Sequence, residues 1–245
     1  MLKNAATPGI LIITGPRTKY GSGHNVRMRK AALLLRKKKI DVTLLCLDEG
    51  SIVDVPLPYS LCILDRRDSA FNPPFKKKGV CYVAIDNRGK ARNEADYTID
   101  LLPHFSMEDN EYQQALTNII LSTAFFDMPS KAQNARVTLH DTFESAKAAA
   151  DFTLPQEKIS QREFLSRLKS ATRPALYFGQ AFFEALDLGL HVQLYPISEY
   201  HKKLAVDFKN RLNKNPYLLD YLNPNALIRF VDTIQKIYKE NKKHD

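Results

Sequence analysis

The chain has 245 residues but only three cysteines, and no apolar run that approaches the length of a membrane-spanning helix. Cys46, Cys62 and Cys81 are too few and too unevenly spaced for a disulfide framework or a zinc site. A spanning helix takes about 20 consecutive apolar residues. The first residues also lack the apolar core of a signal peptide. We therefore expect a cytoplasmic protein without a membrane span.

The sequence also lacks the common motifs for metal, phosphate-loop and nucleophile chemistry. It has no Walker loop, no nucleophile elbow and no cluster of metal-ligand residues. His191 and His201 have no companions at metal-ligand spacing, and His140 has no further support for a role in chemistry. We therefore expect no metal and no cofactor, and we interpret His191 and His201 as structural or surface residues, whereas His140, just after the run at 136–139, could face a ligand cleft.

Positive charge exceeds negative charge, and the formal net charge is +9. Much of the excess lies in lysine and arginine runs at 36–39 and 76–78 and in the tail. A cationic surface favours phosphate-bearing partners. However, no aromatic residues are interleaved with the basic ones as in nucleic-acid-binding modules, so we expect no nucleic-acid partner. The runs are interpreted first as solvated helix ends, where lysine also suits the helix dipole.

Apolar strand-like runs alternate with helical patterns along the first half. Strands are predicted at 9–14, 41–47, 61–65 and 80–86, a basic amphipathic helix after residue 24, and a further helix at 107–126. The strands are apolar on both faces, which is typical of parallel sheets covered by helices on both sides.

A polar, proline-containing segment at 127–135 is interpreted as a linker. After it the alternation resumes, with strands predicted at 136–139, 174–178 and 191–196. The predicted helices are 141–152, with Asp141 as N-cap, 160–168, 179–189, 198–212 and 224–240. We therefore predict an α/β protein of two Rossmann-like parallel-sheet halves, 1–128 and 129–245, facing a cleft.

The joint between the first strand and its helix contains Gly21, Gly23 and His24. Glycine permits positive φ and close approach of a ligand to the backbone. The start of the helix, near Asn25, presents unpaired amides and the positive end of the helix dipole, which suits phosphate. A histidine there can act as a base near neutral pH. The joint is either a tight connection or an anion-facing site.

Two aspartates stand at strand ends, where ligands of parallel sheets bind. Asp65 ends one strand and Asp86 ends the next. The alternative is that each carboxylate caps a turn or joins an ion-pair network with the arginines that follow Asp65. Asn87 and Gly89 are turn residues in either case.

Residues 21–35, "GSGHNVRMRKAALLL", resemble the Gly-x-Gly-His-x-x-Arg signature of certain GT-B-fold proteins. The most similar families are the UDP-sugar hydrolases of pseudaminic acid biosynthesis and the spore-coat polysaccharide glycosyltransferase-like proteins. The segments "CILDRRD" and "YVAIDNRGKARNEADYTID" resemble the two strand-end aspartates of that family and its following strand start. "YFGQAFFEALDLGLHVQLYPISEYHKKLA" looks like its nucleotide-site segment. The resemblance is scattered over most of the chain.

This resemblance implies an enzyme of surface-polysaccharide or nonulosonate-type sugar synthesis that acts on a nucleotide-sugar, most simply a UDP-sugar. His24 would be the general base that activates water at the anomeric carbon, and Asp65 would orient His24 or the sugar. Association with other sugar-biosynthesis enzymes is a further expectation. The remaining residues that the resemblance assigns to substrate binding are Gly21, Gly23, Arg27, Asp86 and Asn87 in the first half, and Gly179, Gln180, Glu184, Ser198, Glu199 and Tyr200 in the second.

Within that set the resemblance gives Glu184 the ribose hydroxyls, and gives Gly179 and Gln180 backbone contacts near the diphosphate. The chain also departs from the family pattern. "RVTLHDTFES", at 136–145, has no glycine where the relatives have a glycine-rich phosphate loop, and the second half is shorter. The alternatives are therefore glycosyl transfer with the same base, or a degenerate protein that binds a nucleotide-sugar without turnover.

Overall fold

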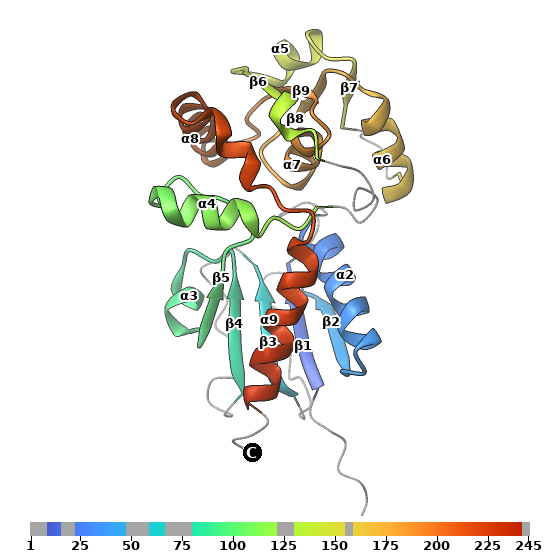
Figure 1. The fold of residues 1–245 in the computed structure, drawn as a ribbon, viewed down its shortest axis with the longest axis vertical. Helices are drawn as coiled ribbons and strands as arrows, with labels where there is room; N and C mark the ends of the chain where they lie inside the picture. The colour runs from blue at the N-terminus through green and yellow to red at the C-terminus, as the bar shows by residue number, and fades with distance from the viewer. Residues whose placement is uncertain are drawn as a thin grey trace, which may run out of the picture. The chain divides into compact units, whose positions relative to one another are not determined.

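The computed structural model describes residues 9–15, 23–47, 59–66, 80–121, 130–154 and 159–241 (Figure 1). Contacts divide the chain into two compact units, Met1–Leu101 with Leu227–Asp245, and Leu102–Ala226. The boundary expected near residue 128 lies outside the described residues and stays a prediction, as does the cleft between the halves. No helix in the described ranges is both long and apolar enough to cross a bilayer.

The first unit is built on a five-stranded, all-parallel sheet in the order β2-β1-β3-β4-β5. Every residue of β1 and β4 is buried, as the apolar runs on both faces predict. The elements of this unit are β1 (Gly9–Thr14), α2 (Gly23–Lys37), β2 (Val42–Cys46), β3 (Tyr59–Asp65), β4 (Cys81–Ile85), α3 (Lys90–Glu94), β5 (Tyr97–Ile99) and α9 (Ala226–Asn241).

The last helix, α9, belongs with the first unit although it comes last in the sequence (Figure 1). Lys38, just after α2, donates to Asp232 (2.9 Å) and Gln235 (3.1 Å) on α9. At the other end of α9, the Asn241 side chain lies close enough to Cys81 to lower the pKa of its thiol in part, although burial raises that pKa more. The chain therefore returns to the first sheet after completing the second.

The second unit has a smaller, four-stranded parallel sheet in the order β6-β9-β8-β7. The two parallel sheets, the second one smaller, confirm the predicted α/β class and are consistent with two Rossmann-like halves. The elements are α4 (Asp109–Thr117), η3 (Ala132–Asn134), β6 (Arg136–Leu139), α5 (Phe143–Ala148), β7 (Phe152–Thr153), α6 (Gln161–Ser170), β8 (Pro174–Leu176), α7 (Gln180–Asp187), β9 (His191–Leu194), α8 (Glu199–Lys214) and η4 (Pro216–Tyr221).

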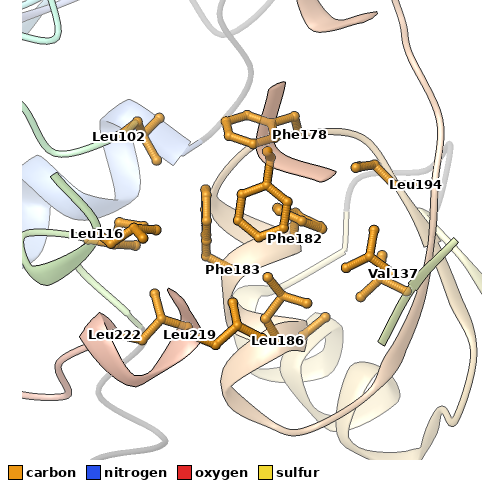
Figure 2. Packing of buried hydrophobic residues seen from close by; sticks show 14 of the residues in the cluster. Leu102, Leu116, Val137, Phe178, Phe182, Phe183, Leu186, Leu194, Leu219 and Leu222 are labelled. Carbon is orange, nitrogen blue, oxygen red and sulfur yellow. The ribbon is translucent and has the colours of Figure 1, made fainter. Parts of the chain in front are cut away.

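Aromatic side chains of α7 fill the core of the second unit (Figure 2). Phe182 and Phe183 are fully buried, and their ring centroids lie 5.1 and 6.0 Å from that of Phe208 on α8. Phe183 faces Leu116 of α4 in Figure 2. Buried rings in edge-to-face contact stabilise a core beyond their burial alone. The spacing of apolar residues along α7 is therefore explained mainly by packing in this core.

Two helices differ from their predicted bounds by more than two residues at an end. The helix predicted at 141–152 is shorter: Thr142, not Asp141, is its N-cap, and it ends at Ala148. Phe152 and Thr153 instead form β7, because they pair with β8. The helix predicted at 107–126 ends at Thr117. The chain beyond it is fixed by a tertiary contact, since the Ile120 carbonyl accepts a hydrogen bond from Gln180.

We expect Gly189→Ala to lower the free energy of unfolding by about 1–3 kcal/mol, the usual cost of a strained backbone conformation. Gly189 follows α7 with φ +77°, and a Cβ there would lie 2.7 Å from the Lys131 carbonyl oxygen. Gly179→Ala is the matched control, because its Cβ would meet only ordinary contacts at 3.5 Å or more. Equal urea-unfolding free energies for the two variants would contradict the prediction.

Candidate functional site

The order of the first sheet places the start of α2 at a topological switch point. The chain leaves β1 for β2 on one side and later fills β3 on the other. In open α/β sheets, ligands bind outside the carboxyl ends of the strands at such a point. Thr14 ends β1, Asp65 ends β3, and Asp86 follows β4, so these three residues share the carboxyl edge.

His24, on the first turn of α2, contacts the carboxylate at the end of β3. Its Nδ1 lies 2.6 Å from Asp65 Oδ1. Arg27 Nη2, a donor, also lies 3.2 Å from Nδ1. The shorter contact is to a carboxylate that can only accept, which favours the tautomer with its proton on Nδ1 and with Nε2 as the basic nitrogen. The resemblance paired these two residues for orientation of a base, and the structure brings them together.

Arg27, one turn further along α2, lies between both strand-end aspartates. Its Nε donates to Asp65 Oδ2 (2.8 Å), and its Nη2 donates to Asp65 Oδ1 (2.5 Å) and Asp86 Oδ2 (2.7 Å). Arg27 is 2 % exposed, and Asp65 is fully buried. The guanidinium therefore binds the protein's own carboxylates, which favours a positioning role for Arg27. The expected contact of Arg27 with substrate stays a prediction.

Asp86 holds Arg27 with one oxygen and the backbone with the other. Its Oδ1 accepts the N–H of Leu101 (2.7 Å). Asp86 has φ +50°, a conformation that few residues other than glycine adopt. This backbone turn, directly after β4, aims the carboxylate at Arg27. Asn87 beside it is fully buried and bonds inside the protein, donating to the Arg66 carbonyl (2.8 Å) and accepting from Gly89 N–H (2.9 Å).

The charges of Asp65, Arg27 and Asp86 stabilise one another. Burial by itself raises the pKa of the Asp65 carboxyl, but attraction to Arg27 and His24 outweighs burial and holds that pKa well below its usual range. Burial likewise lowers the pKa of Arg27, while Asp65 and Asp86 raise it further than burial lowers it. Asp65 and Arg27 are therefore an ionised pair across the whole physiological range.

Asn25 fixes the joint between β1 and α2. Thr14 Oγ1 donates to Asn25 Oδ1 (3.0 Å), and Asn25 Nδ2 donates to the Gly15 carbonyl (3.3 Å). Sequence reasoning gave Asn25 no such role. The helix begins at Gly23, whereas Gly21, which was expected to shape the same pocket, lies outside the described residues.

In the second unit, the resemblance assigns a nucleotide to Gly179, Gln180 and Glu184. All three lie on α7 or at its N-cap. Gly179 is the N-cap of α7, after the carboxyl end of β8. The Gln180 side chain bonds the Ile120 carbonyl and approaches Glu184 Oε1 (3.4 Å). Glu184 is only 3 % exposed, which is unusual for a carboxylate on an amphipathic helix.

Ser198, Glu199 and Tyr200 open α8, after the carboxyl end of β9. Ser198 caps the helix by accepting the His201 N–H (3.3 Å), and its hydroxyl lies 2.8 Å from His201 Nδ1. The His201 ring meets Tyr177, after β8, edge to face at 5.8 Å. The starts of α7 and α8 thus meet at one edge of the sheet, through two rings that sequence reasoning did not select. The signal that could have found Tyr177 is its place near the carboxyl end of a predicted strand, 174–178, because ligands of parallel sheets bind at that end.

The loop after β6, where the family has its glycine-rich phosphate loop, is held by side chains. His140 Nδ1 lies 2.8 Å from Ser145 Oγ, and its Nε2 lies 2.9 Å from Gln193 Oε1. Thr142 Oγ1 accepts the Ser145 N–H (3.3 Å). In this loop, polar groups that could meet a phosphate bond to one another instead.

Within the part of the chain that the structure describes, neither a reactive thiol nor a group of metal ligands adds to the candidate site. Cys62 and Cys81 are buried, and burial raises the thiol pKa of each, that of Cys81 to about 11. Cys46 is exposed at the end of β2. Among the described residues, no three or more histidine, cysteine or acidic side chains are grouped as a metal would require.

The chain matches no protein-family model, no curated protein and no solved structure.

Proposed function

We propose that the chain binds a nucleotide-sugar and hydrolyses it at the anomeric carbon, with His24 as general base. The observation that carries the proposal is the His24–Asp65 contact at the switch point of the first sheet (2.6 Å). A base needs a fixed tautomer and orientation, and a buried carboxylate on Nδ1 supplies both. The proposed setting is surface-polysaccharide or nonulosonate-type sugar synthesis, beside other enzymes of that synthesis.

In this mechanism, His24 Nε2 takes a proton from water, and the water oxygen attacks the anomeric carbon. The bond from that carbon to the diphosphate oxygen breaks, and the nucleoside diphosphate leaves with the electron pair. Asp65 stabilises the imidazolium as it forms. Arg27 and Asp86 hold Asp65 in place. His24 is 5 % exposed, so the mechanism requires the ring to gain access to solvent when substrate binds.

The proposed nucleotide site is at the start of α7. N–H groups in the first turn of a helix have no partner within the helix and favour anions such as a diphosphate. The Gln180 side chain bonds the Ile120 carbonyl, so its contribution comes from the backbone. Glu184, four residues after Gln180, accepts hydrogen bonds from the ribose hydroxyls.

The second candidate is a protein that binds the nucleotide-sugar without turnover. The loop after β6 favours it, since His140 is engaged by Ser145 and Gln193 in place of a phosphate nest. Both candidates predict binding, and only the first predicts release of nucleoside diphosphate.

We expect one nucleotide family to raise the melting temperature in a screen of UDP, GDP, CMP and their sugars. A ligand that binds only the native state at 100 times its Kd stabilises it by about 2.7 kcal/mol, a shift of several degrees. Glu184→Gln should remove the shift. Glu163→Gln, at an exposed carboxylate on α6 that is paired with Arg167, should keep it. No shift with any nucleotide would overturn both candidates.

A further inference from the structure

The amino-terminal end of the second sheet gathers cationic side chains on one face. Arg136 of β6 is in register with His191 of β9. Ala175 of β8 is in register with Gln193, which puts Arg173 level with His191 on the other side. Residues in register on parallel strands project from the same face of a sheet. We call these three residues, Arg136, His191 and Arg173, the basic face.

The basic face is open to solvent because the helix on that side covers only part of the sheet. α5 packs on β8 and β9 nearer their carboxyl ends, where Ala146 meets Ala175 in a small apolar cluster. Arg136 and Arg173 are exposed, and His191 is partly exposed. Lys209 of α8 lies at the edge strand beside them, where its Nζ donates to the Val137 carbonyl (2.7 Å).

Within the described residues, neither Arg136 nor Arg173 is paired with a carboxylate. Asp151, near Arg173, already accepts the backbone N–H groups of Thr172 and Arg173 and the Thr172 hydroxyl. Partial burial lowers the pKa of His191, and the charges of Arg136, Arg173 and Lys209 lower it further. Like charges held together repel one another, and a bound anion relieves this repulsion.

The His191 ring has a defined orientation within the cluster. Its Nε2 lies 2.8 Å from Thr138 Oγ1, one pleat further along β6. The backbone N–H of His191 donates to the Thr172 carbonyl (3.1 Å), which ties β9 to the turn that carries Arg173. Arg136 and His191 therefore lie on adjacent strands, and Arg173 lies in a turn that is hydrogen-bonded to β9.

We propose that the basic face is a second anion site, which takes a phosphate group carried by a small molecule. Guanidinium groups bind phosphate through paired N–H donors, and two of them flanking an imidazole match its several oxygens. The site is distinct from the proposed nucleotide site. Gly179 and Ser198 follow the carboxyl ends of β8 and β9, whereas the basic face is at their amino ends. The inference does not depend on the proposed hydrolysis.

The test is an NMR titration of the full chain with inorganic phosphate and pyrophosphate at constant ionic strength, following the His191 ring. We expect both anions to shift the His191 signals and to raise the pKa of the ring, because a bound anion stabilises the imidazolium. The double variant R136Q/R173Q should bind at least tenfold more weakly, because glutamine keeps hydrogen-bond donors but has no positive charge for the phosphate.

The matched control is R162Q/R167Q, which removes the same charge from exposed positions on α6 and should leave the affinity unchanged. The nucleotide-induced rise in melting temperature should also survive in R136Q/R173Q, which separates this site from the nucleotide site. An equal loss of phosphate affinity in both double variants would overturn the proposal, as would His191 signals that respond to an RNA oligonucleotide but to neither phosphate nor pyrophosphate.

Discussion

Replacing Arg27 by leucine is expected to lower the free energy of unfolding by about 3–5 kcal/mol, the cost of breaking a buried ion pair. The variant leaves two carboxylates, Asp65 and Asp86, in the interior without the guanidinium that bonds both of them. Uncompensated charge in a buried setting is costly because neither water nor a counter-charge solvates it. Urea unfolding at pH 7, followed by circular dichroism, measures the change.

The matched control is Arg92→Leu in the same unit. Arg92 also forms a two-point contact with an aspartate, donating to Asp100 at 2.9 and 3.1 Å, but its side chain is 28 % exposed. Solvent screens such pairs, so we expect a loss of about 1 kcal/mol or less. Comparable losses in the two variants would show that the Arg27 network is no more important to stability than a surface pair.

The pH dependence of stability gives an independent check on the same network. The folded-state pKa of Asp65 is depressed, so its contribution is present above the unfolded carboxyl pKa of about 3.9 and is lost as pH falls toward the folded-state value. Wild-type stability should therefore decline through the acid range, and Asp65→Asn should decline less steeply. If the unfolding free energies of the wild type and Asp65→Asn fell equally with pH, the lowered pKa of Asp65 would be contradicted.

Replacing His24 by asparagine is expected to reduce release of nucleoside diphosphate from a nucleotide-sugar by about 10²–10⁴-fold, the usual contribution of a general base. The physical reason is that asparagine cannot take a proton from water at neutral pH. The nucleotide-induced rise in melting temperature should persist, because the proposed nucleotide contacts belong to Gly179, Gln180 and Glu184. A coupled assay for free nucleoside diphosphate gives the rate.

His140→Gln serves as the control for a general effect of losing an imidazole, since His140 makes its bonds in the second unit. Its turnover should remain within about twofold of the wild type, because the proposed mechanism gives His140 no step. Unchanged turnover in His24→Asn would remove His24 from the mechanism. Nucleotide binding without turnover in the wild-type protein would favour the binding role instead.

Several elements could be predicted from the sequence because their signals are local. The buried runs of β1, β3 and β4 show in the sequence as unbroken apolar stretches, and the helical stripe of α2 follows from its spacing. Asp65 and His24 were selected because one ends a strand and the other begins a helix. β7 could not be predicted in this way, since Phe152 and Thr153 form a strand only through their pairing with β8.

The sequence by itself determined the α/β class and the positions of His24, Asp65 and Asp86 at the carboxyl ends of strands. Hydrophobic periodicity and strand ends depend only on residues that are close together in the chain. Only the tertiary structure decided that Arg27 bonds both carboxylates and that α9 returns to the first unit. The same holds for the basic face, where Arg136 of β6 and His191 of β9 meet Arg173, which lies just before β8. These features join residues far apart in the chain, and strand order, which no local pattern specifies, determines which of them meet.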